Sequence, residues 1–447
     1  MPSINLPKLP KGKIFEECVS AFFQSAGQYI ERNIIERDIE EILELDIIAT
    51  DYNSKLPDIK LLEVKSGNWG FPDIFKIRGW RDYLNIEKGI LIVHNKKLNF
   101  DFVKEKAKEI DIELGLISKL EKAKEELSIF INNSDKIDDL DVYVWRFSYW
   151  IERNLLKHLN HKKKSHGNVK CYQALENYYH DLNGGIFFTE NIVQKLGKLF
   201  STFQKYPHIS AKCGNEITGK SFEEECKVLP KQVFIDTYYE CKYTDIQIST
   251  FIEHRARLAI LKNVVDYILY KNAEHINKTE GEFEIKFKDK IIKIPLKDWL
   301  LPSQFDKKID IIAKHKYFFR YPVFWQWFMW AFGGFILKDY EKREYEILSK
   351  KSEIPLSEIP NAFDAYEILF PSSPGGSWFS DLSPNINIKM LKMFPIPFSG
   401  LGAHYRKWLY TKSGNYEDLK LSGLHTMDKL VQWNNLMVKV LQREKSL

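Results

Sequence analysis

Two short aliphatic segments near the start of the chain carry charged residues at positions that a strand would turn toward one face. The first segment, residues 44–49, contains Asp46. The second segment, residues 61–67, contains Glu63 and Lys65. Aliphatic and β-branched residues favour strands, and turn-forming residues follow both segments. Because side chains alternate along a strand, Glu63 and Lys65 are expected on the same face. If the two strands pair, two carboxylates and one ammonium group converge.

This set of side chains suits the binding of a divalent metal ion. Mg²⁺ is a small, hard cation that prefers oxygen ligands, so one or two carboxylates and a substrate phosphate hold it. A bound metal lowers the pKa of its water and stabilises charge on a leaving oxygen, and a lysine adds a further cation. Glu16, on a helix expected before the first strand, would complete the acidic rim.

The same residues could also be ordinary surface residues without a catalytic role. A Glu-x-Lys pair is common on the solvated face of an ordinary strand, and an Asp at a strand end is still more ordinary. The order of elements favours a site over this alternative. A helix, a strand with Asp, a turn, a strand with Glu-x-Lys, and then a further helix and strand follow one another.

Three short motifs in this order resemble the PD-(D/E)xK nuclease superfamily. They are GKIFE at residues 12–16, ELDIIA at residues 44–49 and LEVK at residues 62–65. Within the superfamily, the chain is most similar to the Mrr-like restriction endonucleases and the archaeal Holliday-junction resolvases. The resemblance covers about the first quarter of the chain.

The resemblance implies roles for individual residues. Asp46, Glu63 and Glu16 would be ligands of Mg²⁺ or Mn²⁺, and Lys65 would assist the attacking water. Glu17 adjoins Glu16, and although the Gly-x-x-Phe-Glu spacing favours Glu16, the choice between the two acids stays open.

The expected fold class is an α/β restriction-endonuclease-like domain, with a mixed sheet flanked by helices, followed by a mostly α-helical domain. A chain of 447 residues fits two or three domains. We expect the nuclease-like domain at residues 10–118, a helical connector at 119–135 and the mainly helical domain at 136–447. The sequence does not show whether this last domain selects the target, regulates activity or binds a partner. The continuous apolar run at residues 89–94 predicts a strand buried on both faces.

The helix predicted at residues 72–84 carries Lys76, Arg78 and Arg81, which could contact a phosphate backbone, although a solvated face is the more common role for each of them. A second basic cluster, residues 161–166, is typical of a solvated loop that could also approach phosphates.

The region after residue 136 is rich in aromatic residues. Residues 251–272 predict a long helix, and alternation at residues 281–294 predicts a β-hairpin. The most apolar stretch, residues 321–337, contains Gln326 and a glycine pair. This composition favours a buried core helix, or an aromatic face against a partner, over membrane insertion. Residues 372–377 predict a loop that lacks the Lys-Ser/Thr pair of a phosphate-binding loop.

Charge and cysteine content limit the classes of protein further. The formal net charge of +5 is modest, so binding of a polyanion would need local positive charge. The five scattered cysteines fit free thiols in a reducing compartment, and the N-terminus has no signal-peptide pattern. We therefore expect a cytoplasmic location and no membrane association.

The sequence favours a metal-dependent endonuclease that acts on nucleic acid, with DNA favoured over RNA. The resemblance suggests restriction or another defence against phages and plasmids. The alternative is a non-catalytic nucleic-acid-binding or assembly subunit that keeps the nuclease fold as a scaffold. A third class, a membrane-associated effector, would act through residues 321–337. A homodimer, or a protein partner bound through the C-terminal domain, is expected because a double-strand break usually needs two active sites.

Overall fold

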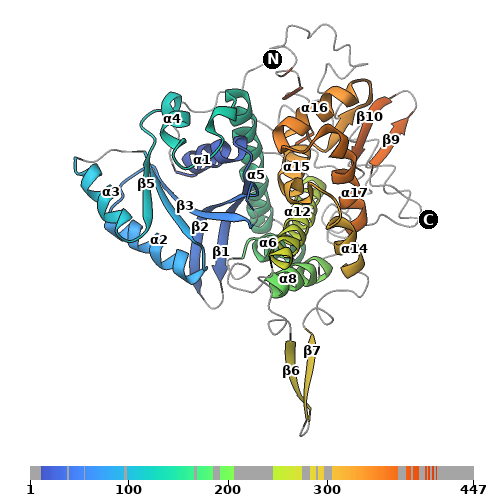
Figure 1. The fold of residues 1–447 in the computed structure, drawn as a ribbon, viewed down its shortest axis with the longest axis horizontal. Coiled ribbons are helices and arrows are strands. Elements are labelled where there is room, and N and C mark those ends of the chain that lie inside the picture. The colour runs from blue at the N-terminus through green and yellow to red at the C-terminus, as the bar shows by residue number, and fades with distance from the viewer. Residues whose placement is uncertain are drawn as a thin grey trace. The chain divides into compact units, whose positions relative to one another are not determined.

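The chain divides into two compact units in a computed structural model (Figure 1). The N-terminal unit comprises Met1–Arg146 and Asn183–Asn191, and the helical unit comprises Phe147–Leu182 and Ile192–Leu447. The structure describes residues 12–37, 40–54, 56–94, 98–165, 169–184, 192–205, 245–273, 282–287, 290–295, 305–370, 379–383, 386–391, 398–399, 401–402, 405–406 and 409.

The N-terminal unit is built on a five-stranded mixed sheet with the strand order β1-β2-β3-β4-β5. β1, β2 and β3 pair antiparallel, whereas β3, β4 and β5 pair parallel. This layout confirms the expected mixed sheet with flanking helices. The elements are α1 (Lys13–Ser25), β1 (Tyr29–Arg37), β2 (Glu41–Asp51), β3 (Asp58–Lys65), α2 (Phe71–Tyr83), β4 (Lys88–Val93), α3 (Phe100–Lys108), β5 (Ile112–Leu116), η1 (Leu120–Lys122), α4 (Ala123–Leu127), η2 (Ser134–Lys136) and the first residues of α5 (Asp139–Ser165).

Helices cover both faces of this sheet. α2 and α3 pack with the strands in one buried apolar cluster that includes Ile77, Leu91 and Val103. Leu62 and Ile47 are also fully buried but lie outside that cluster, as expected for strand residues that face the other side. α1 contacts β1, β2 and β3. β4 is therefore buried on both faces, as its continuous apolar sequence predicted.

The N-terminal unit is larger than the sequence indicated. The expected connector, residues 119–135, is partly helical but packs within the unit, where Phe130 and Ile131 are buried. Lys60 Nζ donates a hydrogen bond to the Phe130 carbonyl oxygen (3.2 Å), and Asn132 Nδ2 donates one to Asp51 Oδ2 (3.2 Å). The predicted boundary at residue 118 therefore falls inside the unit, because apolar side chains beyond it are needed to complete the core.

The second unit is mostly helical, as expected, and it contains two small sheets. The three-stranded sheet has the order β8-β10-β9, and β6 and β7 form the predicted hairpin. Its elements are the remainder of α5, α6 (Val169–Leu182), α8 (Ile192–Lys205), α12 (Asp245–Asn272), β6 (Glu282–Phe287), β7 (Lys290–Pro295), α14 (Phe305–Ile312), η4 (Phe318–Arg320), α15 (Tyr321–Gln326), η5 (Trp327–Ala331), β8 (Phe335–Leu337), η6 (Lys338–Tyr340), α16 (Glu341–Ser352), η7 (Leu356–Glu358), α17 (Ile359–Leu369), β9 (Phe379–Ser383) and β10 (Ile386–Leu391).

The apolar stretch at residues 321–337 is buried in the core of the helical unit, as predicted, but it is not one helix. α15 continues into the π-helical turn η5, and Gly333 and Gly334, with φ of 70° and 75°, end it before β8. Trp325 stacks on Tyr366 with ring centroids 4.3 Å apart. In the described part of the chain, no helix is long and apolar enough to cross a membrane.

Two other predicted segments can be placed only in part. Residues 161–165 of the basic cluster belong to α5 and are helical, so the loop expected there is wrong for these residues. A long amphipathic helix simply continues through them. Residue 166 of that cluster and the predicted loop at 372–377 lie outside the described residues.

Candidate active site

Strand pairing brings Asp46 and Glu63 to the same part of the sheet. The last pair of the antiparallel β2–β3 ladder is Ile47 with Leu62. Asp46 precedes Ile47 on β2 and Glu63 follows Leu62 on β3, so the two acids lie opposite each other just beyond that pair. Asp46 Oδ2 accepts a hydrogen bond from the backbone N–H of Val64 (2.8 Å). The Asp46 carboxylate therefore lies at the end of this ladder and is fixed to the strand that carries Glu63.

β2 is irregular at Asp46. In the β1–β2 ladder, Arg32 pairs with Ile47 and Ile34 pairs with Leu45, but Asn33 and Asp46 between them do not pair. Asn33 has a left-handed backbone with φ of 53°. Leu45 and Ile48 both belong to the cluster beneath α2 and α3. Residues three apart face opposite sides of a regular strand, so β2 changes face between them. Asp46 lies at this change of face, which simple alternation did not predict.

The Glu63 carboxylate is buried and binds two lysines. Its side chain is 1% exposed, and Oε1 lies 2.6 Å from Lys65 Nζ and 3.1 Å from Lys76 Nζ. Glu63 and Lys65 thus share a face, as the strand pattern predicted. Glu63 Oε2 is also buried, and within the described part of the chain it has no hydrogen-bond partner. Oε1 of this carboxylate therefore forms ion pairs with two lysines, whereas Oε2 has no hydrogen-bond donor among the described residues.

The start of α1 is attached to the end of β3. The backbone N–H of Gly12 donates a hydrogen bond to Ser66 Oγ (2.7 Å), and Ser66 follows Lys65 directly. Gly12 has φ of 53°, a conformation that glycine adopts without steric cost. This contact holds the first turn of α1, with Glu16, beside the strand that carries Glu63.

The electrostatic interactions distinguish Glu16 from Glu17. The charge of Glu16 raises the pKa of Asp46, and the charge of Glu63 raises the pKa of Glu16. Glu17 is buried and acts on the pKa of Glu16 and of Cys18 instead. Glu16 is therefore the acid of α1 that interacts with Asp46 and Glu63.

Burial, together with repulsion from neighbouring carboxylates, raises the pKa of two of the acids, Asp46 and Glu16. Burial, with the charges of Glu63 and Glu16, raises the pKa of Asp46 to about 8, against the opposing hydrogen bond from Val64 and the charge of Lys65. Burial also raises the pKa of Glu16. Burial and the neighbouring carboxylates therefore favour the protonated form of Asp46, whereas the charges of Arg32 and Lys13 oppose the rise at Glu16.

Lys65 remains a cation in this surrounding. Burial favours the neutral amine, but the hydrogen bond and charge of Glu63, with the charges of Asp46 and Asp73, raise the pKa of Lys65 overall. The side chain is 29% exposed, so the ammonium group is accessible to solvent while it contacts Glu63.

The donor chemistry of these residues fits a divalent cation. Carboxylate oxygens are the ligands that Mg²⁺ and Mn²⁺ prefer, and a cation would relieve the repulsion that raises the pKa of Asp46 and Glu16. The unpartnered Oε2 of Glu63 is a free acceptor for such an ion. In the conformation observed, no three His, Cys, Asp or Glu side chains of the described residues are arranged to hold a metal. Glu63 is instead occupied by lysines.

Sequence reasoning missed His94, which lies beside these residues. Its backbone N–H donates to the Lys65 carbonyl oxygen (3.0 Å), its Nδ1 lies 2.8 Å from the Ile117 carbonyl oxygen, and its ring is 5.3 Å from that of Phe15. His94 directly follows β4, which pairs parallel with the strand of Glu63. Because carboxyl ends of parallel strands meet at one edge, its position after the apolar run was a usable signal.

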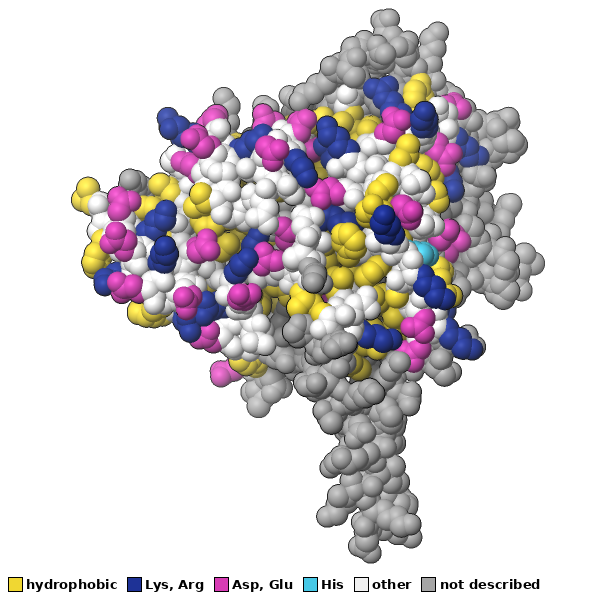
Figure 2. All heavy atoms as spheres, in the orientation of Figure 1, with side chains coloured by type: hydrophobic (Ala, Val, Ile, Leu, Met, Phe, Trp, Pro, Cys, Tyr) yellow, Lys and Arg dark blue, Asp and Glu magenta, His cyan; other side chains and the backbone are white. Residues whose placement is uncertain are grey.

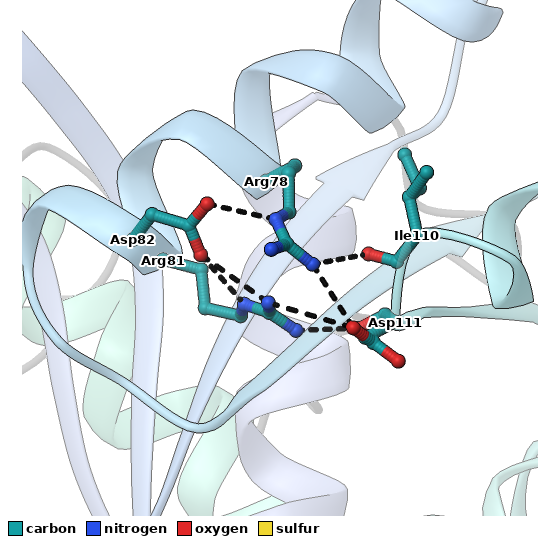
Figure 3. Close-up of polar contacts among 5 residues, drawn as sticks. All are labelled: Arg78, Arg81, Asp82, Ile110 and Asp111. Carbon is teal, nitrogen blue, oxygen red and sulfur yellow. Dashed lines mark hydrogen bonds and ion pairs between the residues drawn. The ribbon is translucent and has the colours of Figure 1, made fainter.

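The three basic residues of α2 have different partners. Arg78 donates to Asp82 Oδ2 (2.8 Å), to Asp111 Oδ2 (3.0 Å) and to the carbonyl oxygen of Ile110 (2.9 Å). Arg81 is mostly buried and donates to the carbonyl oxygen of Asp111 (2.8 Å), as Figure 3 shows. Both arginines thus fasten α2 to the turn before β5, whereas Lys76 contacts Glu63.

Surface charge is mixed on the face of the molecule that Figure 2 shows. Lysine and arginine side chains alternate there with aspartate and glutamate over the described surface. The described residues on this face therefore form no large basic patch that would bind a polyanion. Positive charge at the acidic site comes from Lys65 and Lys76 at Glu63, and from Arg32 and Lys13, whose charges act on Glu16.

Comparison of the chain with known protein families, with curated proteins and with solved structures finds no match.

Proposed function

We propose that the protein is a metal-dependent endonuclease that hydrolyses phosphodiester bonds, with DNA as the favoured substrate. The observation that carries this proposal is the convergence of Glu16, Asp46, Glu63 and Lys65 around the C-terminal end of β3, the central strand of a mixed sheet. A scaffold has no need of three neighbouring carboxylates, two of which, Asp46 and Glu16, have a raised pKa, because repulsion between them destabilises the fold.

In this proposal Asp46, Glu63 and Glu16 hold Mg²⁺ or Mn²⁺. When bound, the ion lowers the pKa of a water molecule and stabilises the negative charge of the phosphoryl group. Lys65 stays protonated because of its acidic neighbours, and it orients the attacking water or neutralises charge that develops in the transition state. Glu63 positions Lys65 through their 2.6 Å contact.

The preference for DNA and a role in restriction or other defence against foreign DNA come from the resemblance to Mrr-like enzymes. The proposal also includes a homodimer, or a partner bound through the helical unit, because each chain supplies one such site. A plasmid substrate distinguishes single-strand nicking from paired cleavage of both strands.

The direct test is cleavage of plasmid DNA with Mg²⁺ or with EDTA. The wild type is expected to cut only with the metal, and Lys65→Ala is expected to lose activity about 100-fold or more. The matched control is Lys104→Ala on α3, an exposed lysine that keeps the acidic site intact. Metal-dependent cleavage that survives Lys65→Ala would refute the assigned role. Absence of cleavage of both DNA and RNA with metal present would refute the enzyme.

A second candidate is a non-catalytic nucleic-acid-binding subunit that retains this fold as a scaffold. The contacts of Glu63 with two lysines favour it, because such a network can be structural. Titration with Mn²⁺ separates the two candidates. A nuclease is expected to bind Mn²⁺ and to lose it in Asp46→Ala, whereas a scaffold binds nucleic acid equally well with and without the ion.

A further inference from the structure

Lys76 is a second cation on the acidic site, and it comes from outside the sequence motifs. Its Nζ lies 3.1 Å from the same Glu63 oxygen that Lys65 contacts at 2.6 Å. Lys76 belongs to α2, whereas Glu63 and Lys65 belong to β3. Two ammonium groups from different elements thus share one oxygen of a buried carboxylate.

Lys76 is held loosely compared with the residues around it. Its side chain is 39% exposed, and besides Glu63 it contacts the ring of Trp80, with 3.9 Å from Nζ to the ring centroid. Trp80 lies one turn further along α2, where residues four apart are neighbours. Trp80 is partly buried, and a cation–π contact made by a lysine that is itself 39% exposed gains only modest stabilisation. The Lys76 ammonium therefore has a fixed resting position that it can leave at low cost.

The two lysines are not held equally at Glu63. Lys65 Nζ lies closer to the Glu63 oxygen, at 2.6 Å against 3.1 Å for Lys76, and its side chain is less exposed, at 29% against 39%. When a divalent cation takes the Glu63 carboxylate, two ammonium groups at that carboxylate are repelled. Lys76 is the more exposed of the two, so it is the one that moves away.

The arginines of α2 cannot take its place. Arg78 and Arg81 are paired with Asp82 and Asp111 and hold α2 to the turn before β5 (Figure 3). Lys76 is the cation of this helix that lies at the acidic site and still reaches solvent.

We propose that Lys76 is a phosphate-binding residue of this site that Glu63 holds in the metal-free protein. It is released toward a backbone phosphate of the nucleic acid when a divalent cation binds. This inference rests on the proposed nuclease function. It assigns the recognition of the substrate phosphate to a residue outside the motif.

The inference is tested with Lys76→Met, Lys76→Arg and the control Lys104→Met, which removes the same charge from an exposed position on α3. The first arm titrates the full-length protein with Mn²⁺ alone. Lys76→Met is expected to bind Mn²⁺ about 3- to 10-fold more tightly than the wild type, because a competing cation has been removed. Lys104→Met is expected to match the wild type.

The second arm measures binding of a short DNA duplex in Ca²⁺ over a range of salt concentrations. Lys76→Met is expected to weaken binding about 5- to 10-fold and to reduce the slope of log K against log salt by about one. Lys76→Arg keeps the charge and is expected to restore both quantities. Because Lys76 is partly exposed, these variants are expected to fold, and their circular dichroism and Tm verify it.

Each arm can overturn one half of the inference. Unchanged or weaker Mn²⁺ binding by Lys76→Met would overturn the competition with Glu63. Unchanged DNA affinity and salt slope would overturn the phosphate contact, while cleavage by the wild type would leave the proposed function intact. If the wild type binds neither Mn²⁺ nor DNA, the proposed function itself fails, and this inference fails with it.

Discussion

Replacement of Asp46 by asparagine is expected to stabilise the metal-free protein, increasingly so as the pH rises. Burial, Glu63 and Glu16 raise the pKa of Asp46 from 3.8 to about 8. Between these two pH values the folded protein keeps a proton that the unfolded chain has lost. Stability falls with rising pH wherever the folded state binds more protons, so this carboxyl lowers the free energy of unfolding across the whole window.

The size of the effect follows from the width of that window. Each pH unit is worth about 1.4 kcal/mol, so the roughly four units from 3.8 to about 8 set an upper limit of about 5 kcal/mol near pH 7.5. Asp46 is only partly buried, and water that reaches it lowers this figure to about 2–4 kcal/mol. Asparagine keeps an oxygen that can accept the Val64 N–H, so little stability is lost in exchange.

Hydrogen exchange of the β2 and β3 amides, corrected for the intrinsic pH dependence of exchange, measures this free energy for the N-terminal unit alone. It is compared for the wild type and Asp46→Asn in EDTA between about pH 5 and about pH 8.5. The advantage of Asp46→Asn is expected to grow up to about pH 8 and then to level off. Asp101→Asn, an exposed site on α3, is the matched control.

Two results would refute this reasoning. One is an Asp46→Asn protein that is no more stable than the wild type near neutral pH. The other is a difference between the two proteins that does not change with pH. Added Mn²⁺ is expected to stabilise the wild type and not Asp46→Asn, because a ligand that binds only the folded state stabilises it.

Three further predictions concern the helical unit. Arg406→Met leaves the buried carboxylate of Glu344, 2.9 Å from Arg406 Nη2, without this partner. It is expected to cost about 3–5 kcal/mol in urea unfolding, and a loss below about 1 kcal/mol would contradict it. Gly333→Ala places a Cβ 2.5 Å from the Phe398 carbonyl oxygen at φ of 70°, and an unchanged Tm would contradict the expected loss of about 2 kcal/mol or more. Burial and the charge of Arg257 lower the pKa of His254 well below 6.5, so stability is lost as the pH falls below 6.5. His254→Gln is expected to make that loss shallower in unfolding measurements down to about pH 4.5, and an unchanged pH dependence would contradict it.

Much of the N-terminal unit could be predicted because its signals are local. The helix expected before the first strand is present as α1, and the unbroken apolar run predicted the buried strand β4. The alternation of side chains predicted that Glu63 and Lys65 share a face, and the contact between them agrees. Each of these features depends on residues within one turn or one strand of each other.

The features that failed or were missed depend on residues far apart in the chain. The core of the N-terminal unit continues to Arg146 and includes Asn183, whose carbonyl oxygen accepts a hydrogen bond from the Ile35 N–H (3.0 Å). Residues 321–337, expected as a buried core helix or an aromatic face against a partner, are buried but do not form one helix. Backbone near Phe398 packs against Gly333, where the helical part has ended. The residues next to each position in the sequence do not indicate such long-range contacts.

The sequence by itself determined that Glu63 and Lys65 share one face of a strand, because side chains alternate along a strand, and this is a local property. Only the tertiary structure decided how those charges are balanced. The break of the β1–β2 ladder opposite Asn33 sets the position of Asp46, and the packing of α2 on the sheet brings Lys76 to Glu63. The physical reason is that a buried charge is governed by its surroundings in space, and these are assembled from elements that are separated in sequence.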